Sequence, residues 1–318
     1  MIKLQEVKFD CLKNEKSIAF SNKYVIICTG KRVIVCDRDL SVLKTFCDMH
    51  YVYDAKISPD EQQLLLISSS NCFYVVDLNS FEIRKHTVIG TYSGNLEGRG
   101  CWAFDSQSFY LVGSSKRNGV SAIIQYNTHD ATSPTNLYLA GRYSIFYIKA
   151  IQETGQYVAV GLDHNRSKLE NGSSWSIIKF DGENSEELQI PEIFGDCVRY
   201  VQYHPTLNSL KICCIQNDVS IALGVPKDGS LFKINDIIEN NAFKLPIGSI
   251  INSYCLSSDE AKIYIATNKG LFVGDYNNRK IIASKRYKHG VLDVKELNNK
   301  LLLLSTVNGI KAFEILSD

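Results

Sequence analysis

Short apolar stretches recur along the whole chain, and each ends at an acidic or amide residue. RVIVCD ends at Asp37, CFYVVD at Asp77 and WSIIKFD at Asp181. Stretches of this length that are rich in Val, Ile, Tyr and Phe are typical of buried β-strands. The only helix-like segment is NDIIEN at 235–240, which we interpret as a loop because it shows no sustained 3.6-residue period. The pattern therefore predicts an all-β protein.

The strand ends are spaced almost regularly. Each is preceded by a first apolar strand, a turn containing Pro, Asp, Gly or Asn, and a second apolar strand, because these turn residues favour chain reversal. A repeat of about 40 to 54 residues with four strands per unit is typical of a β-propeller. The repeats end near Asp37, Asp77, Asn127, Asp181, Asn235, Asp275 and Glu314. We predict one domain over 1–318, a seven-bladed β-propeller with four-stranded antiparallel blades.

The two ends of the chain complement each other. The last repeat supplies only three strands, at 291–297, 301–306 and 310–315, whereas the apolar segment 2–9 precedes the first full repeat. We expect residues 2–9 to form the fourth strand of the last blade, which closes the ring and removes an open sheet edge. A solenoid is the alternative, but incomplete terminal repeats fit a ring better. Truncation of residues 1–10 is then expected to be strongly destabilising.

The strand ends VCD, VVD, KFD and VGD resemble worn WD40 repeats, in which a Trp-Asp pair occupies this place. The segment SPDEQQLLLIS is also similar to repeats of WD40-like and YVTN-type propellers. The resemblance covers the whole chain and implies a WD40-like propeller. No Trp-Asp pair and no Gly-His opening are present, so the polar network of WD40 repeats is not carried over.

Composition narrows the class of partner. With 35 basic and 34 acidic residues the formal net charge is +1, which disfavours a nucleic acid or an anionic membrane as partner, although a local basic patch is compatible with it. The first residues contain no apolar signal core, and no apolar run approaches the ~20 residues that span a bilayer. We therefore expect a cytoplasmic, intracellular protein. Most of the ten cysteines lie inside apolar runs and should be reduced and buried.

No motif indicates catalysis, a metal or a cofactor. The six histidines form no metal-ligand spacing, and no Cys/His cluster has zinc spacing. The Gly-rich stretch at 90–100 leads into a strand rather than a helix, so it lacks the helix N-terminus of a phosphate site. The oxygen-rich loop at 163–175 lacks the calcium-loop pattern. We expect no enzyme, no cofactor and no metal site. The alternative is a rim-site propeller enzyme that acts on a small molecule such as a lactone.

A partner is expected at the top face of the propeller, where the first strand of each blade begins. Aromatic and Arg residues recur there, and these residue types dominate binding hot spots. Three arginines on one rim could hold an acidic or phosphorylated segment. The interpretation as inter-blade packing or solvated loops stays open for each residue. The predicted site for a protein or peptide partner consists of Tyr51, Tyr53, Arg99, Trp102, Arg142, Tyr143, Phe146, Arg199, Tyr200, Tyr254 and His289.

Overall fold

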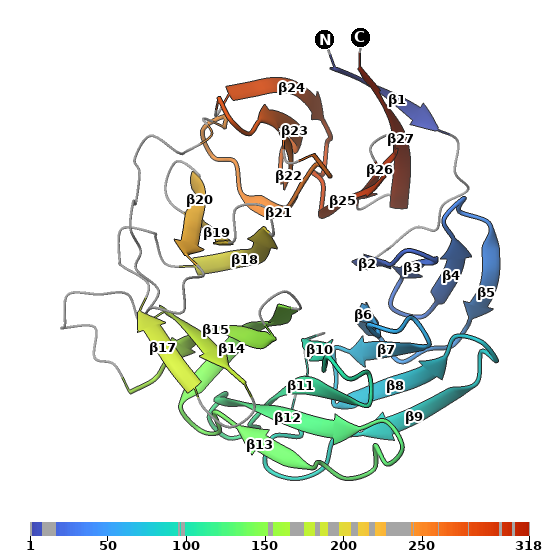
Figure 1. The fold of residues 1–318 in the computed structure, drawn as a ribbon, viewed down its shortest axis with the longest axis vertical. Helices are drawn as coiled ribbons and strands as arrows, with labels where there is room; N and C mark the ends of the chain where they lie inside the picture. Colours follow the sequence, from blue (N-terminus) through green and yellow to red (C-terminus); the bar gives the residue numbers. More distant parts are fainter. Residues whose placement is uncertain are drawn as a thin grey trace. The chain divides into compact units, whose positions relative to one another are not determined.

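The structure is a computed structural model, and its described part is built from antiparallel strands. It describes residues 2–7, 17–94, 96, 99–151, 155–165, 175–181, 185–189, 197–204, 209–215, 220–226, 243, 245–259, 261–278, 280–298, 301–306 and 309–317. These residues form six four-stranded sheets and one three-stranded sheet (Figure 1). Within this part of the chain, no helix is long and apolar enough to cross a membrane. The all-β prediction is confirmed.

The chain divides into two compact units. The middle unit, Lys16–Ile190, contains four consecutive sheets. Its strands are β2 (Ser17–Phe20), β3 (Tyr24–Cys28), β4 (Val33–Asp37), β5 (Val42–Phe46); β6 (Val52–Ile57), β7 (Gln63–Ser68), β8 (Cys72–Asp77), β9 (Ile83–Thr87); β10 (Gly100–Trp102), β11 (Ser108–Ser114), β12 (Ser121–Asn127), β13 (Asn136–Tyr138); and β14 (Tyr143–Ile151), β15 (Gln156–Asp163), β16 (Trp175–Phe180), β17 (Ser185–Gln189).

The terminal unit, Met1–Glu15 with Pro191–Asp318, contains the other three sheets. In the last sheet, β1 pairs antiparallel with β27 from Ile2 opposite Ser317 to Val7 opposite Ala312, so segments from the two ends of the chain share one sheet. Its strands are β18 (Cys197–His204), β19 (Ser209–Ile215), β20 (Ser220–Pro226); β21 (Ile251–Leu256), β22 (Lys262–Thr267), β23 (Gly270–Asp275), β24 (Lys280–Arg286); and β25 (Asp293–Asn298), β26 (Leu301–Thr306), β27 (Gly309–Ser317), β1 (Ile2–Val7).

The core of the middle unit lies between consecutive sheets. Neighbouring residues of a strand point to opposite faces, so Leu64 and Leu66 of β7 pack toward the β2–β5 sheet while Leu65 and Ile67 pack toward the β10–β13 sheet. Both faces of β7 are therefore buried, which explains its unbroken apolar sequence. The first strands β2, β6, β10 and β14 contact one another in that order, and β5, β9, β13 and β17 lie on the opposite side of their sheets (Figure 1).

The acidic strand ends found in the sequence make a local turn. The Asp77 Oδ1 atom accepts hydrogen bonds from the backbone N–H groups of Asn79 (2.9 Å) and Ser80 (2.8 Å). Asp37, Asp275 and Asn127 use the same oxygen in the same way after β4, β23 and β12. Glu314 differs, because it lies inside β27 opposite Leu301. The end expected at Asn235 lies outside the described residues.

The described cysteines form no disulfide bond, and most are buried. Cys28, Cys36, Cys72, Cys101 and Cys255 are buried, whereas Cys47 is exposed. Burial raises the pKa of the Cys101 thiol to about 12, so this side chain stays protonated and packs as a small apolar group. Cys213 and Cys214 are consecutive residues of β19. Their side chains lie outside the described part.

Candidate interaction surface

The first strand of several sheets carries a bulge close to its start. In β6, Val52 pairs with Ser68 and Asp54 with Ile67, so Tyr53 has no residue opposite it. Phe146 is skipped in the same way in β14, Arg199 in β18 and Asn252 in β21. A bulge re-aims the side chain of the extra residue and is frequent beside functional sites. Two of these bulged residues, Tyr53 and Phe146, belong to the middle unit and have exposed side chains.

The start of β6 presents two aromatic side chains. Tyr51 is 51% exposed and Tyr53 is 40% exposed. Tyr51 has a backbone φ of 44°, an uncommon conformation for a bulky residue that costs on the order of 1 kcal/mol. Its carbonyl oxygen accepts a hydrogen bond from the Ser69 N–H at 2.9 Å, which fixes the turn. The chain therefore holds an exposed aromatic residue in a strained turn next to a bulge.

Arg99 and Phe146 link the starts of β10 and β14. The Arg99 guanidinium carbon lies 4.8 Å from the centre of the Phe146 ring, within the range of a cation–π contact. The Arg99 Nη1 atom also donates a 2.6 Å hydrogen bond to the Ile145 carbonyl oxygen. Phe146 is 42% exposed in spite of this contact. The pair forms an aromatic and cationic feature that spans two neighbouring sheets.

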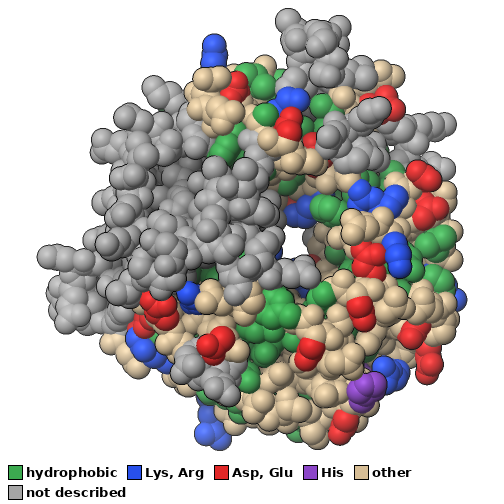
Figure 2. All heavy atoms as spheres, viewed as in Figure 1, with side chains coloured by type: hydrophobic (Ala, Val, Ile, Leu, Met, Phe, Trp, Pro, Cys, Tyr) green, Lys and Arg blue, Asp and Glu red, His purple; other side chains and the backbone are tan. Residues whose placement is uncertain are grey.

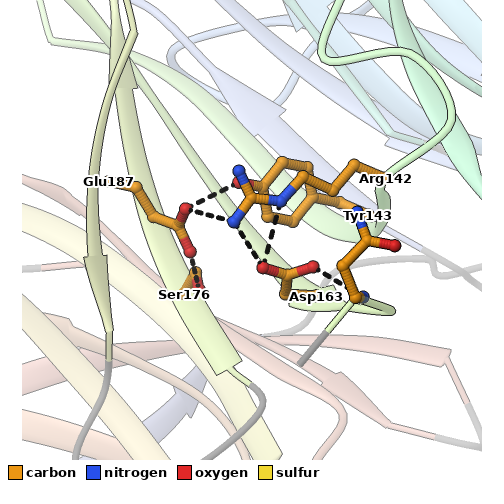
Figure 3. Close-up of polar contacts among 6 residues, drawn as sticks. Arg142, Tyr143, Asp163, Ser176 and Glu187 are labelled. Atoms are coloured by element: carbon orange, nitrogen blue, oxygen red, sulfur yellow. Dashed lines mark hydrogen bonds and ion pairs between the residues drawn. The ribbon is translucent and has the colours of Figure 1, made fainter. Parts of the chain in front are cut away.

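Arg142 lies in a polar network, and its side chain is 42% exposed (Figure 3). Its Nη2 atom contacts Asp163 Oδ2 at 2.6 Å and Glu187 Oε2 at 2.8 Å. The Asp163 side chain is fully buried, and Glu187 also accepts hydrogen bonds from the Tyr143 hydroxyl (2.8 Å) and the Ser176 hydroxyl (2.6 Å). The hydrogen bond to Asp163 raises the pKa of Arg142, so the guanidinium is permanently charged.

This network changes the interpretation of Arg142 as a residue for an acidic partner. Two carboxylates of the same sheet already bind the guanidinium, and together the three groups carry a formal charge of −1. A fully buried carboxylate needs such a partner, since an unpaired charge is costly away from water. We therefore assign Arg142 to the internal structure of the β14–β17 sheet.

Three other residues of the predicted site are buried, which corrects their assignment to a partner surface. Trp102 is 4% exposed, and its indole Nε1 donates a 2.7 Å hydrogen bond to the Lys56 carbonyl oxygen of the preceding sheet. Tyr143 is 3% exposed, and burial together with its bond to Glu187 raises its pKa. Tyr254 is fully buried in the core of the β21–β24 sheet. These aromatics stabilise packing.

The last three residues of the predicted site belong to the terminal unit. His289 is exposed in the loop between β24 and β25. Arg199 and Tyr200 lie on β18, and Arg199 is its bulged residue, but their side chains lie outside the described part. Of the predicted set, the structure brings Tyr51, Tyr53, Arg99 and Phe146 to the starts of consecutive first strands in the middle unit. We call these four the aromatic rim.

Sequence reasoning missed the partners of Arg142. Asp163 ends β15 and Glu187 lies on the outermost strand β17, 45 residues from Arg142. Asp163 follows the apolar run YVAVGL and Glu187 lies beside Glu186, and neither pattern reveals the partner. A second pair, Ser144 Oγ and His164 Nε2 at 2.7 Å, also joins residues far apart in sequence.

The surface chemistry is mixed. On the face in Figure 2, cationic and anionic side chains of the described residues are interspersed. Among these residues, no group of three His, Cys, Asp or Glu side chains is arranged to hold a metal ion. The aromatic rim offers apolar area beside a guanidinium, which suits contact with side chains of another molecule.

Comparisons with known proteins define the fold. No protein-family model and no curated protein matches the chain. The β-propeller domain of Myceliophteria thermophila Cps50 (Swd1) superposes with a TM-score of 0.74 at 10% identity, over 99% of this chain and 100% of that one. Kuenenia stuttgartiensis hydrazine synthase superposes with a TM-score of 0.67 at 14% identity, over 98% of each chain. At these identities the likeness shows the fold alone: the chain has a β-propeller fold.

Proposed function

We propose that this chain is a non-catalytic, WD40-like propeller of seven four-stranded blades, closed by its N-terminal strand, which binds a protein or peptide through its top face. The observation that carries the binding proposal is the pair of exposed, bulged aromatics Tyr53 and Phe146 at the starts of β6 and β14. A bulge that turns a side chain toward water does not improve core packing, but it makes that side chain available to a partner.

The neighbours of these two residues support the same function. Tyr51 holds a strained backbone while its ring is half exposed, and strain of this kind accumulates at ligand-contacting positions. Arg99 stacks on Phe146 and holds it in place from the adjacent sheet. Rigid aromatic side chains lose little conformational freedom on binding, which is why such residues dominate interface energetics. The aromatic rim is therefore the surface we assign to the partner.

The acidic or phosphorylated character of the partner stays a prediction, and within the middle unit it now depends on Arg99 rather than Arg142. Arg142 is bound by Asp163 and Glu187. Buried cysteines without disulfide bonds, as in the described residues, are those expected of a reducing compartment, so we propose that the protein acts in the cytoplasm.

A comparative capture experiment tests this function. The tagged chain, the variant Tyr53→Ala/Phe146→Ala and the control Val42→Ala/Leu43→Ala would be used to capture proteins from native lysate, with quantification by mass spectrometry. Val42 and Leu43 are exposed on the outer strand β5 and lie away from the rim. We expect the rim variant to lose its specific partner by about tenfold or more, as for hot-spot residues, and the control to retain it.

The proposal fails if the rim variant and the control capture the same proteins in the same amounts. Thermal unfolding of both variants at the wild-type temperature is the control for folding, since all four side chains are exposed.

A further inference from the structure

The terminal unit presents the most exposed large apolar side chain of the described residues. Ile247 is 86% exposed at the tip of the loop 245–250, which leads into β21. Ile250 (42% exposed) and Leu292 (38% exposed) are the next exposed aliphatic residues on the same end of this unit. Exposed apolar side chains that lie together in one patch mark a contact site, whereas single ones do not.

Hydrogen bonds hold this tip in one conformation. The Lys269 ammonium donates to the Ile247 carbonyl oxygen, and the Asn268 side chain bonds both the Gly248 carbonyl oxygen (3.2 Å) and the Ile250 N–H (2.8 Å). The Ser249 hydroxyl adds a 2.6 Å bond to the Pro246 carbonyl oxygen. The loop between β22 and β23 thus fixes the backbone of the tip and leaves its aliphatic side chain in water.

A third loop is joined to the same two. The Tyr287 N–H donates to the Lys269 carbonyl oxygen at 3.3 Å, and the Val291 N–H donates to the Thr267 carbonyl oxygen at 2.8 Å. Gly290 has a φ of 73°, and a Cβ atom there would lie 2.6 Å from the Asn268 Cα atom, so only glycine fits. The loops 245–250, 267–270 and 286–292 therefore form one surface, which we call the tip cluster.

The charge of the tip cluster has one sign. It contains Lys269, Arg286 and Lys288 and no acidic residue. Arg286 and Lys288 are exposed. The nearest acidic residue in sequence, Asp293, accepts a hydrogen bond from Ser253 and pairs with Lys295 at 3.2 Å. An aliphatic tip beside exposed cations is the arrangement with which peripheral proteins enter the headgroup region of anionic bilayers.

We propose that the tip cluster docks on the surface of an anionic phospholipid bilayer, with Ile247 inserted among the lipids and Arg286 and Lys288 against the headgroups. A fluid interface accepts a protruding side chain without a matching hollow, whereas a folded partner needs one. The exposed side chains of these three loops are aliphatic or cationic apart from Asn268 and His289, and no Trp, Tyr or Phe side chain, the aromatic anchors typical of protein hot spots, is exposed among them. The overall charge of +1 disfavours a membrane as partner, but the net charge of the chain does not limit the charge of a local cluster.

Sedimentation with vesicles tests the proposal on the full chain. We expect binding to vesicles of mixed phosphatidylserine and phosphatidylcholine that weakens as salt is raised, and little binding to phosphatidylcholine alone. Arg286→Gln/Lys288→Gln should lower the partition coefficient by about 25-fold, since each cation contributes about fivefold. Ile247→Ser should lower it by about tenfold through lost insertion.

The chain offers matched controls in the middle unit. Ile89 is 76% exposed, and Lys116 and Arg117 are adjacent exposed cations. Ile89→Ser and Lys116→Gln/Arg117→Gln should leave vesicle binding unchanged.

Three results would overturn the proposal: no binding to the anionic vesicles at low salt, equal losses in the control variants, or no effect of Ile247→Ser. If instead polyglutamate binds through Arg286 and Lys288 while vesicles do not, the surface serves an acidic protein. The aromatic rim consists of other residues, all in the middle unit, and is tested by other variants, so either proposal can fail without the other.

Discussion

At the scale of single residues, the most informative contact is that of Arg142 with a buried carboxylate. Asp163 is fully buried, and Arg142 supplies its positive partner at 2.6 Å. We predict that Arg142→Gln lowers the free energy of unfolding by about 2 kcal/mol, because a buried charge loses its charged hydrogen-bond donor. Urea unfolding monitored by circular dichroism measures this change.

Two further variants show whether the loss of stability comes from the Arg142–Asp163 ion pair or from the loss of any surface arginine. Arg117→Gln removes an exposed arginine of the same unit and should be neutral. Arg142→Gln/Asp163→Asn should be more stable than the single Arg142→Gln variant, since the double change also removes the buried carboxylate that has lost its positive partner. Equal stability of Arg142→Gln and wild type would contradict the role of this arginine.

The residue scale also shows what the sequence could reveal about the site. Aromatic and Arg residues recur at the starts of first strands, and the sequence alone identified those positions. Exposure, however, depends on which face a residue takes, and a bulge reverses that face locally. Tyr53 and Phe146 are turned outward, while Trp102 and Tyr143 are buried. Register shifts depend on the partner strand, so sequence periodicity could not separate these cases.

At the scale of the structural element, the acidic strand ends are turn-forming residues. The N–H groups of Ser80 and Asn79 donate to Asp77 and lower the pKa of its carboxyl from the ordinary value of 3.8. We predict that Asp77→Ala lowers stability by about 1 kcal/mol, whereas Asp77→Asn costs less, because it keeps the acceptor oxygen and loses only the charge. Asn127 occupies the equivalent place after β12 and accepts such a bond at 2.9 Å.

Unfolding of the same variants at decreasing pH tests whether the charge of Asp77 causes its contribution to stability. A lowered folded-state pKa means that the carboxylate contributes stability above the unfolded value near 3.8, and that this contribution disappears as pH falls through the lower folded value. The advantage of wild type over Asp77→Asn in thermal unfolding should therefore vanish on acidification. An advantage that persists at acid pH would assign it to something other than the charge.

These turns explain why the elements were predictable from the sequence. A strand followed by an Asp or Asn that caps its own turn is a local signal, so Asp37, Asp77, Asn127 and Asp275 mark strand ends correctly. Glu314 instead lies within β27, which continues to Ser317. Pairing with β26 and β1 rather than a local turn sets the length of this strand.

At the scale of the whole molecule, contacts between sheets repeat with the period of the sequence. Trp102 reaches back 46 residues to Lys56, the Asp60 N–H donates to Ser106 over the same separation, and Ser258 reaches Glu296 over 38 residues. The repeat length was visible in the sequence, and the likeness to known β-propellers agrees with it. The partner residues themselves could not be predicted, because no periodicity identifies which side chains cross between sheets.

We propose that the seven repeats form a propeller that is closed by the N-terminal strand. In the terminal unit, β1 pairs with β27 from Ala312 to Ser317, and Glu6 binds Lys311 of that strand. Without β1, the last sheet would keep three strands and an unpaired edge.

Deletion of residues 2–9 is the most direct test of closure by the N-terminal strand. We predict that the melting temperature falls by about 10 °C, with increased aggregation through the exposed edge of β27. A deletion variant that unfolds at the wild-type temperature would contradict the closed propeller.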